Sequence, residues 1–150
     1  GIRKDLQDSA VSAYIQDYII NNSTVSALPD SMLDYQEKSM IRYYEEYAGY
    51  YSMELEEFLP SYAGVANIEE LLANSKEANT RTATFYLIIQ AIAEEMEIEV
   101  KDSDLRDYFI QYAGSEDYTQ FKTYYGKPYL MMMVQAQNVL DHLQEKAVLQ

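Results

Sequence analysis

The sequence predicts an all-α protein, and three observations lead to this prediction. Only five glycines and three prolines interrupt the 150 residues, so the segments between them are long enough to form helices. Most of these segments repeat their apolar residues every three or four positions, which is the period of an amphipathic helix. The one alternation typical of a strand is at residues 98–101, and because it has no second strand to pair with, we expect an extended connection there.

Turn-forming and capping residues divide the first half of the chain. The predicted elements there are helices over residues 3–21, 29–48, 53–59 and 67–73, with an extended link over residues 24–29. Pro29 suits the first turn of the second helix, and Gly49 is typical of the end of one. We expect Ser52 to cap the third helix and Pro60 to terminate it. Asn67 and Glu70 have the spacing of a capping box, which predicts the start of the fourth.

The second half is divided in the same way. The predicted helices there cover residues 76–97, 102–113, 115–126 and 128–150. Asp102 or Ser103 caps the second of them, and Gly114 is its predicted end. Gly126 ends the third helix, and Pro128 begins the last one from a first-turn position. No internal repeat and no low-complexity tract is present in the sequence.

The predicted helices differ in how far apolar residues extend around them. The last helix carries its apolar residues in one narrow arc, which predicts docking by a single face. The helix over residues 76–97 is apolar around most of its middle, and we expect it to be the central core helix. The helix over residues 29–48 has an apolar arc of about 180°, wider than the roughly 100° that one docking face requires. Part of that arc is therefore surplus to packing.

Charge and composition exclude several classes of function. The chain has 25 acidic and 11 basic residues, a formal net charge of −14, so we expect no nucleic-acid partner and no membrane partner. Without cysteine and with a single histidine, His142, it has no set of ligands for a typical zinc site. Phosphate-binding loops and nucleophile motifs are missing too. We predict no catalytic residue, no metal site and no cofactor, with paired glutamates on solvated faces.

The surplus of tyrosine, 16 residues beside seven methionines, has two interpretations. Most tyrosines suit half-buried positions, with the ring packed and the hydroxyl in water. A subset could instead line an open surface that binds apolar peptide, since tyrosine and methionine adapt to many partners. Both interpretations stay open for the tyrosines of the second helix, and core packing is favoured for Met131 to Met133. The candidate binding residues are Met32, Tyr43, Tyr47, Tyr50, Tyr51, Met53, Tyr124, Tyr125 and Met131.

Several short segments, in this order and spacing, resemble the C-terminal domain of trigger factor, the ribosome-associated bacterial folding chaperone. They cover nearly the whole chain: Leu28 to Leu33, Gly49 with Ser52 to Leu59, Leu87 to Glu94, Ile98 to Leu105, and Tyr124-Tyr125-Gly126. The resemblance implies one domain over residues 1–150, an elongated helical body with two protruding helical arms around a crevice.

The same resemblance implies a cytoplasmic module that binds unfolded or nascent polypeptides without ATP. The ribosome-docking domain and the FKBP-like prolyl-isomerase domain of such a protein would lie upstream of this chain. Contact with the ribosome, and any isomerase activity, would then belong to those domains and not to this fragment. The alternative is a structural helical module attached to an isomerase parent, which docks on a neighbouring domain or pairs weakly with a second copy.

Overall fold

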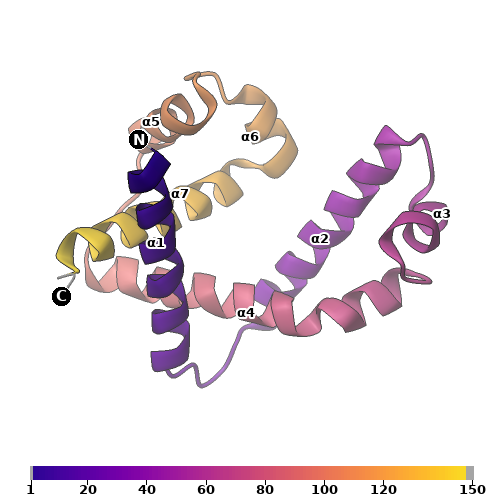
Figure 1. Cartoon of the computed structure of the whole chain (residues 1–150), viewed down its shortest axis with the longest axis horizontal. Coiled ribbons are helices and arrows are strands. Elements are labelled where there is room, and N and C mark those ends of the chain that lie inside the picture. Colours follow the sequence, from indigo (N-terminus) through magenta and orange to yellow (C-terminus); the bar gives the residue numbers. More distant parts are fainter. Residues whose placement is uncertain (1, 148–150) are drawn as a thin grey trace. The chain divides into compact units, whose positions relative to one another are not determined.

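The computed structural model describes residues 2–147, and every regular element in this range is helical (Figure 1). The elements are α1 (Ile2–Asn22), α2 (Asp30–Tyr50), α3 (Leu55–Phe58), a π-helical turn η1 (Leu59–Ala63), α4 (Ile68–Glu95), α5 (Asp102–Ala113), α6 (Thr119–Tyr125) and α7 (Lys127–Lys146). The all-α prediction is therefore confirmed. Within the described range, no helix combines the length and the apolar character that a membrane crossing would need.

The chain groups into two compact units. Unit 1 consists of Gly1–Thr24 and Phe85–Gln150, and unit 2 of Val25–Thr84. Helix α4 contributes its first part to unit 2 and its last part to unit 1.

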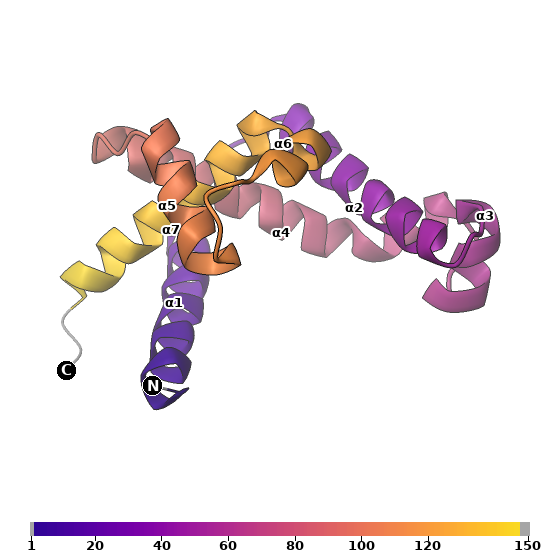
Figure 2. The same ribbon diagram turned by 90° about the horizontal axis from the view of Figure 1, so that it is seen from above.

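Unit 1 is built around α7, which packs with two different faces (Figures 1 and 2). One face meets the end of α4, where Val139 is buried against Ile89. Another face meets α5, where Leu130 is buried against Leu105 and Phe109. The prediction that this helix docks by one face is therefore wrong. Its narrow arc omits Leu130 and Val134, which become buried because α5 lies against them.

Unit 2 contains α2, α3, η1 and the first part of α4. Its core consists of Leu55, Leu59 and Leu71, each from a different element, and half-buried side chains of α2 pack against this core. In the view of Figure 2, α3 lies beyond the end of α2 and beside α4. Within α2 itself only Ala48 is buried.

Two residues that were expected to end helices do not do so. Gly49 lies inside α2, which continues to Tyr50, and the left-handed backbone needed after the helix is supplied by Ser52, with φ of 55°. Pro60 lies within η1, so the chain remains helical to Ala63. The proline ring cannot donate to the Glu56 carbonyl and would crowd it in a regular α-helix. The wider π-helical turn that begins at Leu59 accommodates this interruption and keeps the chain helical.

Two predicted caps and one predicted break also need correction. Ser52 does not cap the third helix, since α3 begins at Leu55 after Glu54 and no side-chain cap is present. Asn67 does begin a helix, because its Oδ1 accepts the N–H of Glu70 at 2.9 Å. That helix is α4, and it runs without the break expected after Ala73. Burial of flanking turns outweighs the weak helix propensity of the residues between 73 and 76.

The helix ends of the second half agree better with the sequence. Gly114 ends α5 with a left-handed φ of 69°, as predicted, and Pro128 lies in the first turn of α7. Asp102 and Ser103 are inside α5 and do not cap it. Asp104 stabilises this start instead, by accepting the N–H of Lys101 at 2.7 Å. Helix α6 begins only at Thr119, because a turn held by side chains of residues 115–117 precedes it.

Candidate functional site

A row of exposed tyrosines follows the second half of α2. Tyr43, Tyr47 and Tyr50 are 51%, 43% and 76% exposed. Their rings touch in sequence, with centroids 4.8 Å apart between Tyr43 and Tyr47 and 6.1 Å apart between Tyr47 and Tyr50. Spacings of three and four residues place these side chains on neighbouring turns of one helix face. The surplus apolar arc predicted for this helix is thus open to solvent.

Two hydroxyl groups in this row, those of Tyr43 and Tyr47, are hydrogen-bonded to each other. A side-chain hydrogen bond between Tyr43 and Tyr47 raises the pKa of Tyr43 above its ordinary value, with smaller contributions from desolvation and from neighbouring tyrosines. The row therefore presents ring faces together with hydroxyl groups that can donate and accept hydrogen bonds.

A second aromatic group lies where α2 gives way to α3 and η1. Tyr51 contacts Tyr62 with ring centroids 4.8 Å apart, and Phe58 stacks on Tyr62 at 5.2 Å. Phe58 is buried, whereas Tyr51 and Tyr62 are more than half exposed. Sequence reasoning missed Tyr62, because Pro60 was expected to end the helix that in fact carries it.

The two candidate methionines of unit 2 are less open than the tyrosines. Met32 lies near the other end of α2 and is half-buried. Met53 is also half-buried, in the turn after α2, where its N–H donates to the carbonyl of Ala48 at 3.0 Å. Neither belongs to the run of tyrosine ring contacts described above.

In unit 1, the tyrosine pair predicted before the last helix lies on α6. Tyr124 is half-buried and Tyr125 is 44% exposed, and their ring centroids are 4.5 Å apart. Tyr125 also stacks on Tyr129 of α7 at 5.1 Å. Burial raises the pKa of the Tyr129 hydroxyl, with a smaller contribution from Tyr125.

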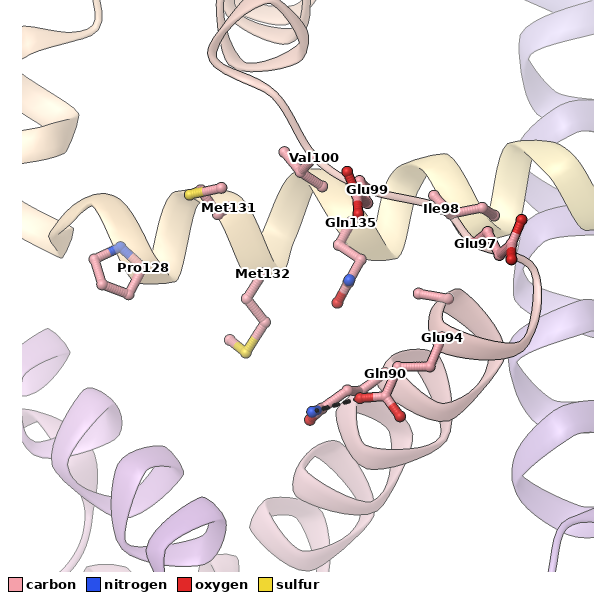
Figure 3. A pocket seen from close by; sticks show the side chains of 11 residues that line it. Gln90, Glu94, Glu97, Ile98, Glu99, Val100, Pro128, Met131, Met132 and Gln135 are labelled. Atoms are coloured by element: carbon pink, nitrogen blue, oxygen red, sulfur yellow. Dashed lines mark hydrogen bonds between the residues drawn. The ribbon is translucent and has the colours of Figure 1, made fainter.

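A cleft of ≈ 1010 Å³ opens in unit 1 between the end of α4, the connection after it and the first turns of α7 (Figure 3). Met131, the remaining candidate, lines it together with Met132. Figure 3 shows Met132 and Gln135 on α7 facing Gln90 and Glu94 on α4. The full lining is Gln90, Ala93, Glu94, Glu97, Ile98, Glu99, Val100, Pro128, Met131, Met132 and Gln135.

The charged side chains that line this cleft are all acidic. Glu94, Glu97 and Glu99 contribute carboxylates, and its lining includes no lysine, arginine or histidine. All three glutamates are exposed, and Glu94 accepts a hydrogen bond from Gln90 at 3.2 Å. The cleft thus combines methionine side chains with an acidic rim.

A second cleft in unit 1, of ≈ 780 Å³, is mainly polar. Side chains of α1, α5 and α7 line it, among them Gln16, Gln111, Gln137 and Gln144. Two of these four amides are engaged within the protein, since Gln137 donates to Asp141 at 2.8 Å and Gln144 to Asp8 at 3.4 Å. Every lining residue except Ala13 has a polar side chain, so this cleft is less suited to purely apolar ligands.

In a comparison with known protein families, residues 2–149 match a family described as the C-terminus of bacterial trigger factor. The match covers nearly the whole chain. The chain belongs to the trigger factor C-terminal family. No curated protein and no solved structure matched the chain in the corresponding comparisons.

The trigger factor C-terminus is the non-catalytic part of that chaperone, because the prolyl-isomerase activity lies in a separate domain. The chain is thus a chaperone-associated domain and not an enzyme. Within residues 2–147, no group of three or more acidic or histidine side chains could hold a metal ion. The paired glutamates expected on solvated faces are exposed, whereas His142 is half-buried, less open than its place on the helical wheel indicates.

The candidate residues of this trigger factor domain therefore fall into separate groups. The tyrosines of α2 are in mutual contact, the pair on α6 contacts α7, and Met131 lines the acidic cleft. Sequence reasoning missed Met132 as a cleft residue, and it missed Glu97 and Glu99 entirely. The strand-like alternation at residues 98–101 was the only local signal for them.

Proposed function

We propose that this trigger factor C-terminal domain binds exposed apolar segments of unfolded or nascent polypeptides, weakly and reversibly, and so delays their aggregation without ATP. The observation that carries the proposal is the open tyrosine row of α2, formed by Tyr43, Tyr47 and Tyr50. Exposed aromatic surface of this extent lowers solubility, and it is typical of a surface that binds a partner.

Tyrosine is well suited to clients of varied sequence. Its ring offers a large contact area with few rotatable bonds, so little conformational entropy is lost on binding. Its hydroxyl bonds equally well to water and to the backbone of a client. A row of such side chains can therefore hold many apolar segments without a fixed sequence pattern.

The acidic character of the chain supports the same proposal. A net charge of −14 keeps copies apart and helps the domain remain soluble when apolar segments are bound. We place its action in the cytoplasm, where nascent chains emerge, with ribosome contact made through an upstream domain. A docking module that pairs with a second copy is the alternative.

An aggregation assay tests the proposal. The 150-residue chain in excess should slow the aggregation of unrelated unfolding proteins, followed by light scattering. Changing Tyr43, Tyr47 and Tyr50 together to serine should weaken this protection, because the exposed aromatic row is lost. Circular dichroism and thermal unfolding should change little, since exposed side chains contribute little to the core.

A matched control is available on α1. Tyr14 and Tyr18 are 69% and 55% exposed and form a single ring pair. Changing both to serine removes exposed tyrosine without touching α2, and protection should persist. Equal protection by the α2 variant would contradict the proposal. A concentration-dependent dimer mass that the α2 variant abolishes would instead support the docking module.

A further inference from the structure

We propose that the acidic cleft of unit 1 binds client segments in an extended conformation, as a strand added along residues 98–101, and prefers segments that alternate apolar and basic residues. This inference rests on the proposed chaperone function and names the conformation and chemistry of one class of client.

The backbone of this connection is only partly used within the protein. The N–H of Ile98 donates to the carbonyl of Ala93 at 2.8 Å, and the N–H of Lys101 donates to Asp104 at 2.7 Å. Between these two fixed points, the N–H and C=O groups of Glu99 and Val100 bond to no other group of residues 2–147. At the edge of a sheet, unpaired backbone groups of this kind accept an added strand, and the connection offers the same groups on a single extended segment.

The connection is also held in place on both sides. Ile98 packs against the core formed by α4 and α7, and Val100 packs against the core formed by α5 and α7. Glu99, between them, is exposed, and all three line the cleft. A residue in an extended chain directs its N–H and C=O to the same edge, so one client residue can exchange two hydrogen bonds with Glu99.

The lining of the cleft determines which side chains suit it. Successive side chains of an added strand point to opposite faces. Met131 and Met132 offer adaptable apolar contacts to one set, while Glu97 and Glu99 attract positive charge in the other set. An acidic client would bring like charges together at this rim. The occupant that fits is therefore an extended segment with alternating apolar and basic residues.

Short capped peptides of defined sequence test the binding mode. The probe is a fluorescein-labelled peptide that alternates leucine and lysine, compared with a peptide of the same composition whose leucines have helical spacing. Binding to the 150-residue chain, followed by fluorescence anisotropy, should be about tenfold tighter for the alternating peptide. N-methylation of alternate residues removes the N–H donors along one edge of the peptide. It should abolish binding when that edge faces residues 98–101, and it should leave binding unchanged when the opposite edge is methylated. Equal binding of all these peptides would overturn the proposal.

Two measurements on the protein locate the site. The amide of Glu99 should exchange its hydrogen more slowly when the alternating peptide is bound, as seen by NMR. Changing Glu97 and Glu99 to glutamine should weaken binding of the lysine peptide and reduce its dependence on salt. The matched control changes Glu56 and Glu57, exposed on α3, to glutamine and should have no effect. A control that weakens binding equally would show attraction by net charge alone and would contradict the site.

The two proposals fail in different ways. If the chain protects unfolding proteins but binds the N-methylated peptides as well as the parent peptide, strand addition is wrong and the chaperone proposal stands. If the chain does not protect unfolding proteins at all, the chaperone proposal is wrong, whatever the peptide measurements show. A variant with Glu99→Pro removes one N–H that has no partner among residues 2–147, and it should lose peptide binding while its helical content is unchanged.

Discussion

Helices α2 and α7 are nearly equal in length, with 21 and 20 residues, and their environments are opposite. Helix α7 buries five side chains, among them Leu130 and Val139, whereas α2 buries only Ala48. The sequence assigned the wider apolar arc to α2, the helix that buries less. The width of an apolar arc therefore indicates how much apolar surface a helix could bury. How much of that surface is covered depends on the neighbouring helices.

This difference also separates the roles of similar residues. Tyr129 on α7 is half-buried and stacked against Tyr125, while Tyr50 on α2 is 76% exposed. The first kind of tyrosine contributes to stability. The second kind is available to a partner.

The largest expected effect is the loss of core packing at α7. Leu130→Ala should lower the free energy of unfolding by about 2–5 kcal/mol, because it leaves a cavity between α7 and α5. Leu130 is only 1% exposed and contacts Leu105 and Phe109. Urea unfolding followed by circular dichroism measures the change. A loss no larger than that of a surface substitution would mean that α5 does not hold this face of α7.

The next largest effect is expected at two glycines, one in each unit. Gly114 ends α5 and Gly64 ends η1, with φ of 69° and 70°, and no atom lies within 4 Å of an added Cβ at either position. Substitution by alanine should therefore lower the free energy of unfolding by about 1–2 kcal/mol at each site, solely because alanine disfavours the left-handed backbone conformation. Urea unfolding of both variants should give similar losses, and a much smaller loss at Gly64 would indicate that unit 2 is less firmly folded.

Gly49→Ala should change stability in the opposite direction. Gly49 lies inside α2, without a positive φ, and no atom lies within 4 Å of an added Cβ. Alanine should raise the free energy of unfolding by up to about 1 kcal/mol, because it forms helix more readily than glycine. A thermal melt checks the sign, and destabilisation would mean that α2 ends at residue 49 in solution.

A still smaller effect is expected from truncating the most exposed tyrosine of α2. Tyr50→Ala should change the free energy of unfolding by no more than about 0.5 kcal/mol, because its ring is largely solvated already. The same unfolding assay as for Leu130→Ala makes the comparison direct. A loss as large as that at Leu130 would show that a partner, such as a second copy, covers this face.

The smallest effect concerns charge at the start of α7. Lys127 Nζ and Asp102 Oδ1 are 2.7 Å apart. Their hydrogen bond lowers the pKa of Asp102 and raises the pKa of Lys127. Because the folded pKa of Asp102 is depressed, its contribution is present above the ordinary aspartate pKa of about 3.9 and is lost as pH falls through the lowered value.

Acid titration of unfolding, compared with Asp102→Asn, detects this contribution. Both groups are exposed, so high salt should reduce it further. The converse holds at high pH, where the contribution of Lys127 disappears only above the ordinary lysine range. A large, salt-resistant difference between the two proteins would mean that charge, and not burial, holds α5 against α7.

Helix ends were predictable where the signal is local. The end of α5 at Gly114 and the start of α7 near Pro128 follow from the backbone preferences of these two residues, and both are where the sequence predicts them. Gly49 is the same residue type as Gly114, yet it continues a helix, because the left-handed position falls on Ser52. The predicted break near residue 74 failed for a related reason, since burial of Leu71 on one side and Ala83 on the other favours one continuous helix.

Surfaces made by several segments were harder to predict. The open face of α2 follows from a single helical wheel, so its tyrosines could be identified from spacing alone. The cleft is lined by α4, the connection after it and α7. No local sequence pattern predicts that Glu99 and Met132 line the same cleft. Likewise, the second buried face of α7 exists only once α5 lies on Leu130.

The tyrosine row of α2 also gives this domain a built-in optical probe. The chain contains no tryptophan, so its intrinsic fluorescence comes from tyrosine alone, and a cluster of three such rings lies on the proposed contact face. A client that carries tryptophan can be excited selectively, free of background from the domain. Excitation of the tyrosines would instead show binding through energy transfer to that tryptophan, without any label on either molecule.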